Sequence, residues 1–104
     1  MKLSDLMFAD GTITSYVLRP DRTLVLTFAD WREETYTLHF AGVTQVEENG
    51  SVNAQVDSGF LKKHADGIEV LFEDDDDKVI LRVCCRSLDI DPAGGPGAAK
   101  LTGP

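Results

Sequence analysis

Apolar and polar residues alternate over much of this chain, which is the period of β-strands and not that of helices. The segments 12–18, 24–28 and 34–40 place apolar residues mostly at every second position, and short polar stretches separate them. The first of these stretches is RPDR, residues 19–22, in which Pro20 suits one corner of a turn and Asp21 the next. The pattern therefore predicts three consecutive antiparallel strands that form a meander with one apolar face.

A register for the meander follows from matching apolar residues across its turns, because a slip of one residue would move each side chain to the other face. The pairs predicted across the first turn are Val17–Leu24, Ser15–Leu26 and Ile13–Phe28. The pairs predicted across the second turn are Phe28–Tyr36, Leu26–Leu38, Leu24–Phe40 and Thr27–Thr37.

Four consecutive aspartates, Asp74–Asp77, separate the apolar runs IEVLFE and KVILRV. The two runs can pair as a hairpin, and the predicted pairs are Phe72–Val79, Val70–Leu81, Ile68–Val83, Glu73–Lys78, Leu71–Ile80 and Glu69–Arg82. Both charged pairs are then of opposite sign, and each contributes about 0.2 to 1 kcal/mol. We expect a four-residue loop, because a two-residue loop would oppose Asp74 to Asp77 and would lack the glycine that a primed turn prefers.

The remaining segments carry weaker patterns. Residues 1–11 predict a short helical turn with Ser4 as its N-cap, and residues 58–67 predict a second one that Ser58 caps and Gly67 ends. Residues 52–56 alternate like a short strand. Residues 92–104 are rich in glycine and proline, and we expect them to form a flexible tail after a single β-rich domain over residues 1–91.

These segments together predict a mainly β fold of about six strands. We expect an antiparallel meander sheet that folds into a small sandwich or a partly open barrel, with one or two short helical turns. The second face of the sheet is not cleanly polar, because six apolar or weakly polar residues are predicted to point there: Tyr16, Leu18, Val25, Leu71, Ile80 and Cys84. Either the segment 41–66 covers this face or another chain does.

Composition places the chain among ordinary globular proteins. It has 104 residues, of which 42% are hydrophobic and 27% are charged. We expect a cytoplasmic protein that does not enter a membrane, because the sequence shows no signal-peptide pattern and no run of about 18 apolar residues. The neighbours Cys84 and Cys85 should point to opposite faces of a strand, so free thiols are expected, with a strained redox-active disulfide between them as the alternative.

Negative charge narrows the classes of partner. The net charge is −8, and a surface of that sign repels nucleic-acid phosphates and anionic lipids. A basic protein is the partner that this charge favours, although acidity is also a common means of keeping a protein soluble.

The aspartate run has three interpretations. The simplest is a solvated turn, since aspartate is a turn-forming residue. The second is an acidic recognition surface, and the third is a Ca²⁺ site. The run lacks the spacing, the central glycine and the closing glutamate of an EF-hand, so we expect neither a metal ion nor a cofactor.

Other candidate chemistry is weak. His39 and His64 have no cysteine or carboxylate at the spacing of a metal site. Ser15, Ser51, His39 and Cys84 could supply parts of a catalytic triad, but no nucleophile elbow or phosphate loop accompanies them, and we expect no enzyme.

Trp31 lies in the loop FADWREE between two predicted strands. We expect its ring to fold back over the end of the sheet, because a lone tryptophan in a small protein is usually recruited to the edge of the core. An exposed ring at an interface is the alternative.

These observations favour a non-enzymatic binding protein that engages a basic partner. Its predicted contact residues are Glu69, Glu73, Asp74, Asp75, Asp76, Asp77 and Trp31. A concrete version is a bacterial immunity or inhibitor protein that covers the cationic active site of a nuclease or a similar toxin. The alternative is a structural or accessory subunit that forms a homodimer through the second sheet face, with the acidic loop serving only solubility.

Overall fold

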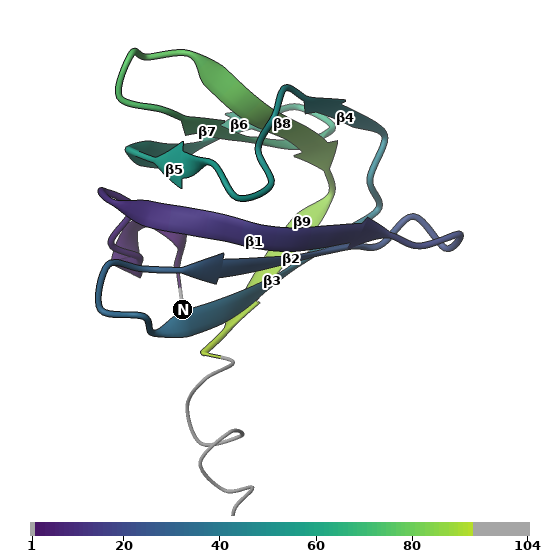
Figure 1. Cartoon of the computed structure of the whole chain (residues 1–104). Helices are drawn as coiled ribbons and strands as arrows, with labels where there is room; N and C mark the ends of the chain where they lie inside the picture. Colours follow the sequence, from purple (N-terminus) through teal and green to yellow (C-terminus); the bar gives the residue numbers. More distant parts are fainter. Residues whose placement is uncertain (1, 93–104) are drawn as a thin grey trace, which may run out of the picture.

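The structure is a computed structural model of the chain, and it describes residues 2–92 (Figure 1). One 3-10 turn, η1, spans Leu3–Asp5. The strands are β1 (Gly11–Leu18), β2 (Leu24–Ala29), β3 (Thr35–Ala41), β4 (Gln45–Glu48), β5 (Gln55–Val56), β6 (Ser58–His64), β7 (Gly67–Glu73), β8 (Val79–Cys85) and β9 (Ser87–Asp91). The predicted mainly β fold is confirmed, and the predicted tail lies outside the described residues from residue 93 on.

Two antiparallel sheets form a small sandwich. The five-stranded sheet has the order β5-β1-β2-β3-β9, and the four-stranded sheet has the order β4-β8-β7-β6. The two layers face each other (Figure 1). The chain passes from one to the other between β3 and β4, between β4 and β5, between β5 and β6, and between β8 and β9. The core between them is built by fully buried side chains of both sheets, the largest being Phe28, Phe40, Phe72, Ile13, Leu24, Leu26, Leu38 and Leu81. Of the two predicted architectures, the sandwich is therefore the one observed.

The predicted register of β2 and β3 is confirmed at all four pairs. Between β1 and β2 only the pair Ile13–Phe28 is confirmed, because the register shifts between Ile13 and Ser15. Beyond this bulge Ser15 pairs with Thr27 and Tyr16 with Leu26. The bulge turns Tyr16 toward the core, against which it packs, and leaves Val17 exposed.

The hairpin of β7 and β8 forms, but its predicted register is wrong by two residues. Phe72 pairs with Leu81 and Val70 with Val83, and the register shifts between Phe72 and Glu73. From Phe72 back to Ile68 the shift is an even number, so the apolar side chains of β7 keep the faces predicted for them. At the bulge Glu73 pairs with Val79 instead of Lys78, a shift of one residue, and Ile80, predicted for the second face, lies in the core.

Residues 58–67 were expected to be helical, and that prediction is wrong. Residues Ser58–His64 form β6, each paired with a residue of β7. A helical turn here would leave the edge of β7 without a partner, so sheet pairing outweighs the local capping signals. Gly67 closes this hairpin with a φ of 156°, at a point where a Cβ atom would lie 2.4 Å from the carbonyl oxygen of Cys85.

The short N-terminal turn forms, but Ser4 is not its cap. The backbone N–H of Lys2 donates to the Asp5 carboxylate over 2.8 Å, which places the cap two residues earlier. In the segment 52–56 only Gln55–Val56 is a strand, since Val52 makes one isolated bridge with Ile13.

Candidate functional site

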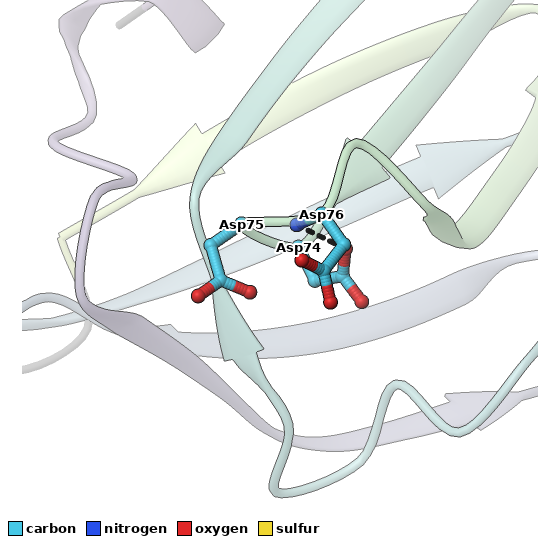
Figure 2. Close-up of side chains that lie close together, drawn as sticks. All are labelled: Asp74, Asp75 and Asp76. Carbon is cyan, nitrogen blue, oxygen red and sulfur yellow. Dashed lines mark hydrogen bonds between the residues drawn. The ribbon is translucent and has the colours of Figure 1, made fainter.

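The aspartates Asp74–Asp77 lie in the loop between β7 and β8, as predicted, but the loop also includes Lys78 and is one residue longer than the four expected. The backbone N–H of Asp74 donates to the carbonyl of Lys78 over 3.0 Å, and that of Asp77 donates to the carbonyl of Asp74 over 3.1 Å. One carboxylate oxygen of Asp74 accepts hydrogen bonds from the backbone N–H groups of Asp76 and Lys78, at 2.9 and 3.0 Å (Figure 2). Asp74 is therefore a structural residue of the loop, and its role resembles that of an N-cap.

The other three aspartates of the loop are exposed. Among the described residues no side chain or backbone group donates a hydrogen bond to the carboxylates of Asp75, Asp76 or Asp77. Asp77 has a φ of 59°, a left-handed conformation that aspartate tolerates better than most residues. These three side chains present charge to solvent from a backbone that Asp74 holds in place.

The loop between β2 and β3 repeats this construction. Asp30 takes the place of Asp74, and its backbone makes equivalent bonds to Glu33 and Glu34, both over 2.9 Å. One oxygen of its carboxylate accepts from the backbone N–H groups of Arg32 and Glu34, at 2.9 and 3.0 Å. Glu33 has a φ of 66° and corresponds to Asp77. Trp31 and Asp75 consequently occupy the same position in two equivalent loops.

Trp31 does not fold back over the sheet, so that prediction is wrong. Its exposed fraction is 60%, among the largest of the apolar side chains. The physical reason is Asp30, whose carboxylate is buried and occupies the inside of the loop. The Arg32 guanidinium closes over that carboxylate at 2.7 Å, which leaves Trp31 directed outward.

The charge state of Asp30 follows from two opposing effects. Burial raises the pKa of its carboxyl, while hydrogen bonds from the Arg32 side chain and from the backbone of Glu34 and Arg32 lower it. The hydrogen bonds outweigh burial, so the pKa lies below its ordinary value. Asp30 is therefore ionised at neutral pH and holds Arg32 as its counterion.

Strand pairing brings these two loops to the same end of the molecule. Thr12 pairs with both Ala29 and Gln55, and the backbone N–H of Asp57 donates to the carbonyl of Glu73 over 2.8 Å. The start of β1 and the end of β5 thus lie between the two loops, and both loops lie on the left in Figure 1.

We call this end of the molecule the acidic end. Its carboxylates are Asp10, Asp30, Glu33, Glu34, Asp57, Glu73, Asp74, Asp75, Asp76 and Asp77, and its cations are Arg32 and Lys78. Two cations and ten carboxylates sum to −8, which equals the net charge of the whole chain. The sequence did not point to Asp10, Asp57, Glu33 or Glu34, because only the strand order shows that they lie at the same end of the molecule as the aspartate loop.

Glu69, which was predicted to share this surface, lies elsewhere. It is on the outer face of the four-stranded sheet, where its carboxylate contacts the Arg82 guanidinium and lies 2.9 Å from Nε2 of His64. Arg82 also donates to Glu47 over 2.6 Å. Hydrogen bonds from His64 and then Arg82 lower the pKa of Glu69. The predicted contact with Arg82 thus exists, but as a diagonal one, since the direct partner of Glu69 on β8 is Cys84.

The aspartate loop offers little to a cation. One oxygen atom from each of Asp74, Asp75 and Asp76 lies within 4.8 Å of the others, the one such group within residues 2–92 (Figure 2). Asp74 already uses an oxygen to hold the loop, and Ca²⁺ takes six to eight oxygen ligands. The geometry gives no argument for a calcium site.

The other residues considered for chemistry are dispersed. His39 lies on the five-stranded sheet, 3.4 Å from Asp91, whereas His64 lies on β6 with Glu69. Ser51 is buried and donates to Glu48 over 2.9 Å. Both cysteines are free thiols, and burial raises the pKa of Cys85 to about 11.

The six residues expected on a second sheet face do not share one surface. Ile80 belongs to the core and Tyr16 packs against it. Val25 and the exposed Leu18 lie on the five-stranded sheet, while Leu71 and Cys84 lie on the four-stranded sheet, with Leu71 buried. The bulge in β1 and the division into two sheets explain why one continuous face does not exist.

Comparisons of the chain with protein-family models, with curated proteins and with solved structures find no match. No helix within residues 2–92 is long and apolar enough to cross a membrane.

Proposed function

We propose that the chain is a non-enzymatic binding protein that engages a basic protein partner through the acidic end. The observation that supports this proposal is that, among the described residues, ten carboxylates and two cations gather at one end of the molecule, where the ring of Trp31 is also exposed. Charge of one sign steers a partner of the opposite sign, and an exposed aromatic side chain on a rigid loop is a frequent anchor of interfaces.

The distribution of charge favours recognition over solubility alone. A protein kept soluble by acidity needs charges spread over its surface, whereas here they are concentrated at one end. The turn between β1 and β2, at the opposite end, carries Arg19 and Arg22 with Asp21 between them. The segment 41–43 joins Arg86 to this turn, because Arg86 donates its backbone N–H to Ala41 and Val43 donates its own to Arg22. Concentrated carboxylates repel one another, and a cationic partner would remove that repulsion.

The more specific form of the proposal is an immunity or inhibitor protein for a nuclease or a similar toxin. A nuclease active site binds a polyanion, and the exposed carboxylates of the acidic end could occupy its cationic groups. Co-expression with the product of the neighbouring gene tests this form. We expect that product to be toxic alone and to copurify with this chain when both are present.

The direct test compares two variants with the same net charge. Asp75→Asn/Asp76→Asn removes two charges from the acidic end and keeps Asp74, which holds the loop. Asp66→Asn/Asp89→Asn removes two exposed charges elsewhere, and Trp31→Ala removes the aromatic anchor. Partners are captured from a lysate at low salt, identified, and their affinities for each variant are measured by titration.

We expect the loop variant and Trp31→Ala each to weaken binding of a basic partner by about tenfold, and the control pair to leave it within about twofold. Equal weakening by the two charge variants would show that only net charge matters. Retention of full affinity by the loop variant would contradict the proposed surface. Light scattering after size exclusion of the free chain tests the homodimer predicted as the alternative.

A further inference from the structure

An apolar groove opens between two sheet edges on this sandwich. It lies between β6, an edge of the four-stranded sheet, and β9, an edge of the five-stranded sheet, and η1 borders it. Its volume is about 560 Å³, which is within the range of small-molecule sites.

The walls of the groove are mainly aliphatic. Leu61 and Ile68 come from the four-stranded sheet, and Leu88 and Ile90 from β9. Leu61, Ile68 and Leu88 are only partly buried although they pack against the core. Covering these three side chains with an apolar ligand would remove further hydrocarbon surface from water.

The charge of the groove is opposite to that of the whole chain. Lys2 and Lys63 line it, and among the described residues none that lines it carries a carboxylate. Side chains alternate along a strand, so Lys63 lies on the same face of β6 as Leu61, whose partner Val70 is in the core. The nearby Asp5 carboxylate already accepts the backbone N–H of Lys2.

We propose that this groove binds a small amphipathic anion, an unbranched apolar chain of about 8 to 12 carbons that ends in one carboxylate. The chain would lie against Leu61, Ile68, Leu88 and Ile90, and the carboxylate would lie between Lys2 and Lys63. A single charge fits best, because the net charge of −8 repels polyanions while two nearby lysines compensate one carboxylate.

Lys63 also has a simpler interpretation, since lysines on edge strands prevent sheets from pairing with one another. That role concerns Lys63 alone and does not involve Lys2, which precedes η1 and lies outside both sheets. It also predicts that the groove binds no ligand, so titration of the protein with a ligand separates the two interpretations.

The test uses the full chain, with decanoate as the probe and decanol as its uncharged counterpart. Calorimetry gives the affinity, and amide chemical shifts of the labelled chain give the location. We expect a decanoate Kd of about 10 to 100 μM, weaker binding of decanol, and shift changes centred on Leu61, Ile68, Leu88 and Ile90.

Neighbouring lysines provide a matched pair of variants. Lys63→Gln should weaken decanoate binding by about fivefold. Lys62→Gln should change it by less than about twofold, because Lys62 lies on the opposite face of the strand from Lys63 and does not line the groove. Leu88→Trp should fill the groove and abolish binding, and an unchanged circular dichroism spectrum would show that this variant folds.

Three results would overturn the proposal. The first is no detectable decanoate binding by the wild-type chain up to about 1 mM. The second is a set of shift changes on the outer sheet faces instead of the groove. The third is equal weakening by Lys62→Gln and Lys63→Gln, which would show attraction to charge without a site.

Discussion

Asp30 and Asp74 have the same structural role in two loops. Each carboxylate lies inside its loop and accepts the backbone N–H groups of the residues two and four positions further on. Asp30 is also buried and paired with Arg32, whereas Asp74 is partly exposed. The loop that presents Trp31 is thus fastened more firmly than the loop that presents the aspartates.

Removal of the Asp30 carboxylate should destabilise the protein. We expect Asp30→Ala to lower the free energy of unfolding by about 1 to 3 kcal/mol, because the part-buried backbone N–H groups of Arg32 and Glu34 and the Arg32 side chain lose their acceptor. Asp75→Ala is the matched control, since it sits in the equivalent loop without such a role, and it should change the value by less than about 0.5 kcal/mol. Urea unfolding at pH 7 measures both.

The contribution of Asp30 should also depend on pH. Its pKa in the folded state lies below the ordinary value of 3.8, so the unfolded chain takes up the proton first as the pH falls. The stabilisation is therefore fully present above about pH 4 to 5 and is lost as the pH falls through the folded-state pKa. The stability difference between wild type and Asp30→Ala should shrink over that interval, and a difference that stays constant down to pH 2 to 3 would contradict the assignment.

The adjacent cysteines should react very differently. Cys85 is buried, and burial raises its pKa to about 11, so its thiol stays protonated and inaccessible at pH 8. Cys84 is partly exposed on the other face of β8. A thiol reagent should modify one cysteine per native chain and two in denaturant, and Cys84→Ser should abolish the native reaction. Modification of two thiols in the native chain would contradict this placement.

At the scale of elements, three hairpin loops share one backbone construction. The loops that begin at Arg19, Asp30 and Asp74 have the same two backbone hydrogen bonds. In each the fourth residue is left-handed, and none is glycine: Arg22, Glu33 and Asp77 have φ angles of 68°, 66° and 59°. A residue with a side chain is destabilised by about 1 to 2 kcal/mol in this conformation, and glycine avoids part of this destabilisation.

Glycine at one of these positions should therefore stabilise the hairpin. We expect Glu33→Gly to raise the free energy of unfolding by about 0.5 to 1 kcal/mol. Glu34→Gly is the control with the same change of charge. It should lower the free energy of unfolding, because φ of Glu34 is not positive and because its carboxylate contacts Tyr36 and Arg32. Thermal unfolding of both variants measures these changes in stability, and a destabilised Glu33→Gly would contradict the strain argument.

The sequence allowed much of the fold to be predicted, because its signals were local. Alternation located the strands of the meander, and the pairs between β2 and β3 were correct. The errors came from features without a local signal. The bulge at Thr14 changes which side of β1 faces inward, and β6 follows from the need of β7 for a partner. The aspartate loop was identified because its signal is local, a run of four aspartates. Asp10 and Asp57 were not identified, because no local signal shows that they lie at the same end of the molecule as that loop.

At the scale of the whole molecule, charge is distributed unevenly. The carboxylates of the acidic end lie on two loops, at the end of β7 and in the segments directly before β1 and after β5, with Arg32 already engaged by Asp30. This leaves Lys78 as the free cation of that end among the described residues. Repulsion within the acidic end therefore opposes folding and is reduced by salt.

Salt should consequently stabilise the free protein. We expect the unfolding temperature to rise by a few degrees between low salt and about 0.5 M NaCl. Asp75→Asn/Asp76→Asn should unfold at a higher temperature than wild type at low salt and should respond less to added salt. The control Asp66→Asn/Asp89→Asn should keep most of the salt dependence. A wild-type protein that is indifferent to salt would show that the carboxylates do not interact appreciably.

The common architecture of the loops 30–34 and 74–78 makes them interchangeable in principle. Each begins with an aspartate that holds the backbone in place, so the second residue, Trp31 or Asp75, is free to vary without disturbing the strands on either side, whereas Arg32 remains as the counterion of Asp30. Trp31 could be moved to the position of Asp75, or an aspartate to the position of Trp31, within an unchanged framework. The sandwich thus has two loops of the same backbone structure at one end. Different recognition residues can be placed in these loops to redirect the protein toward a new partner.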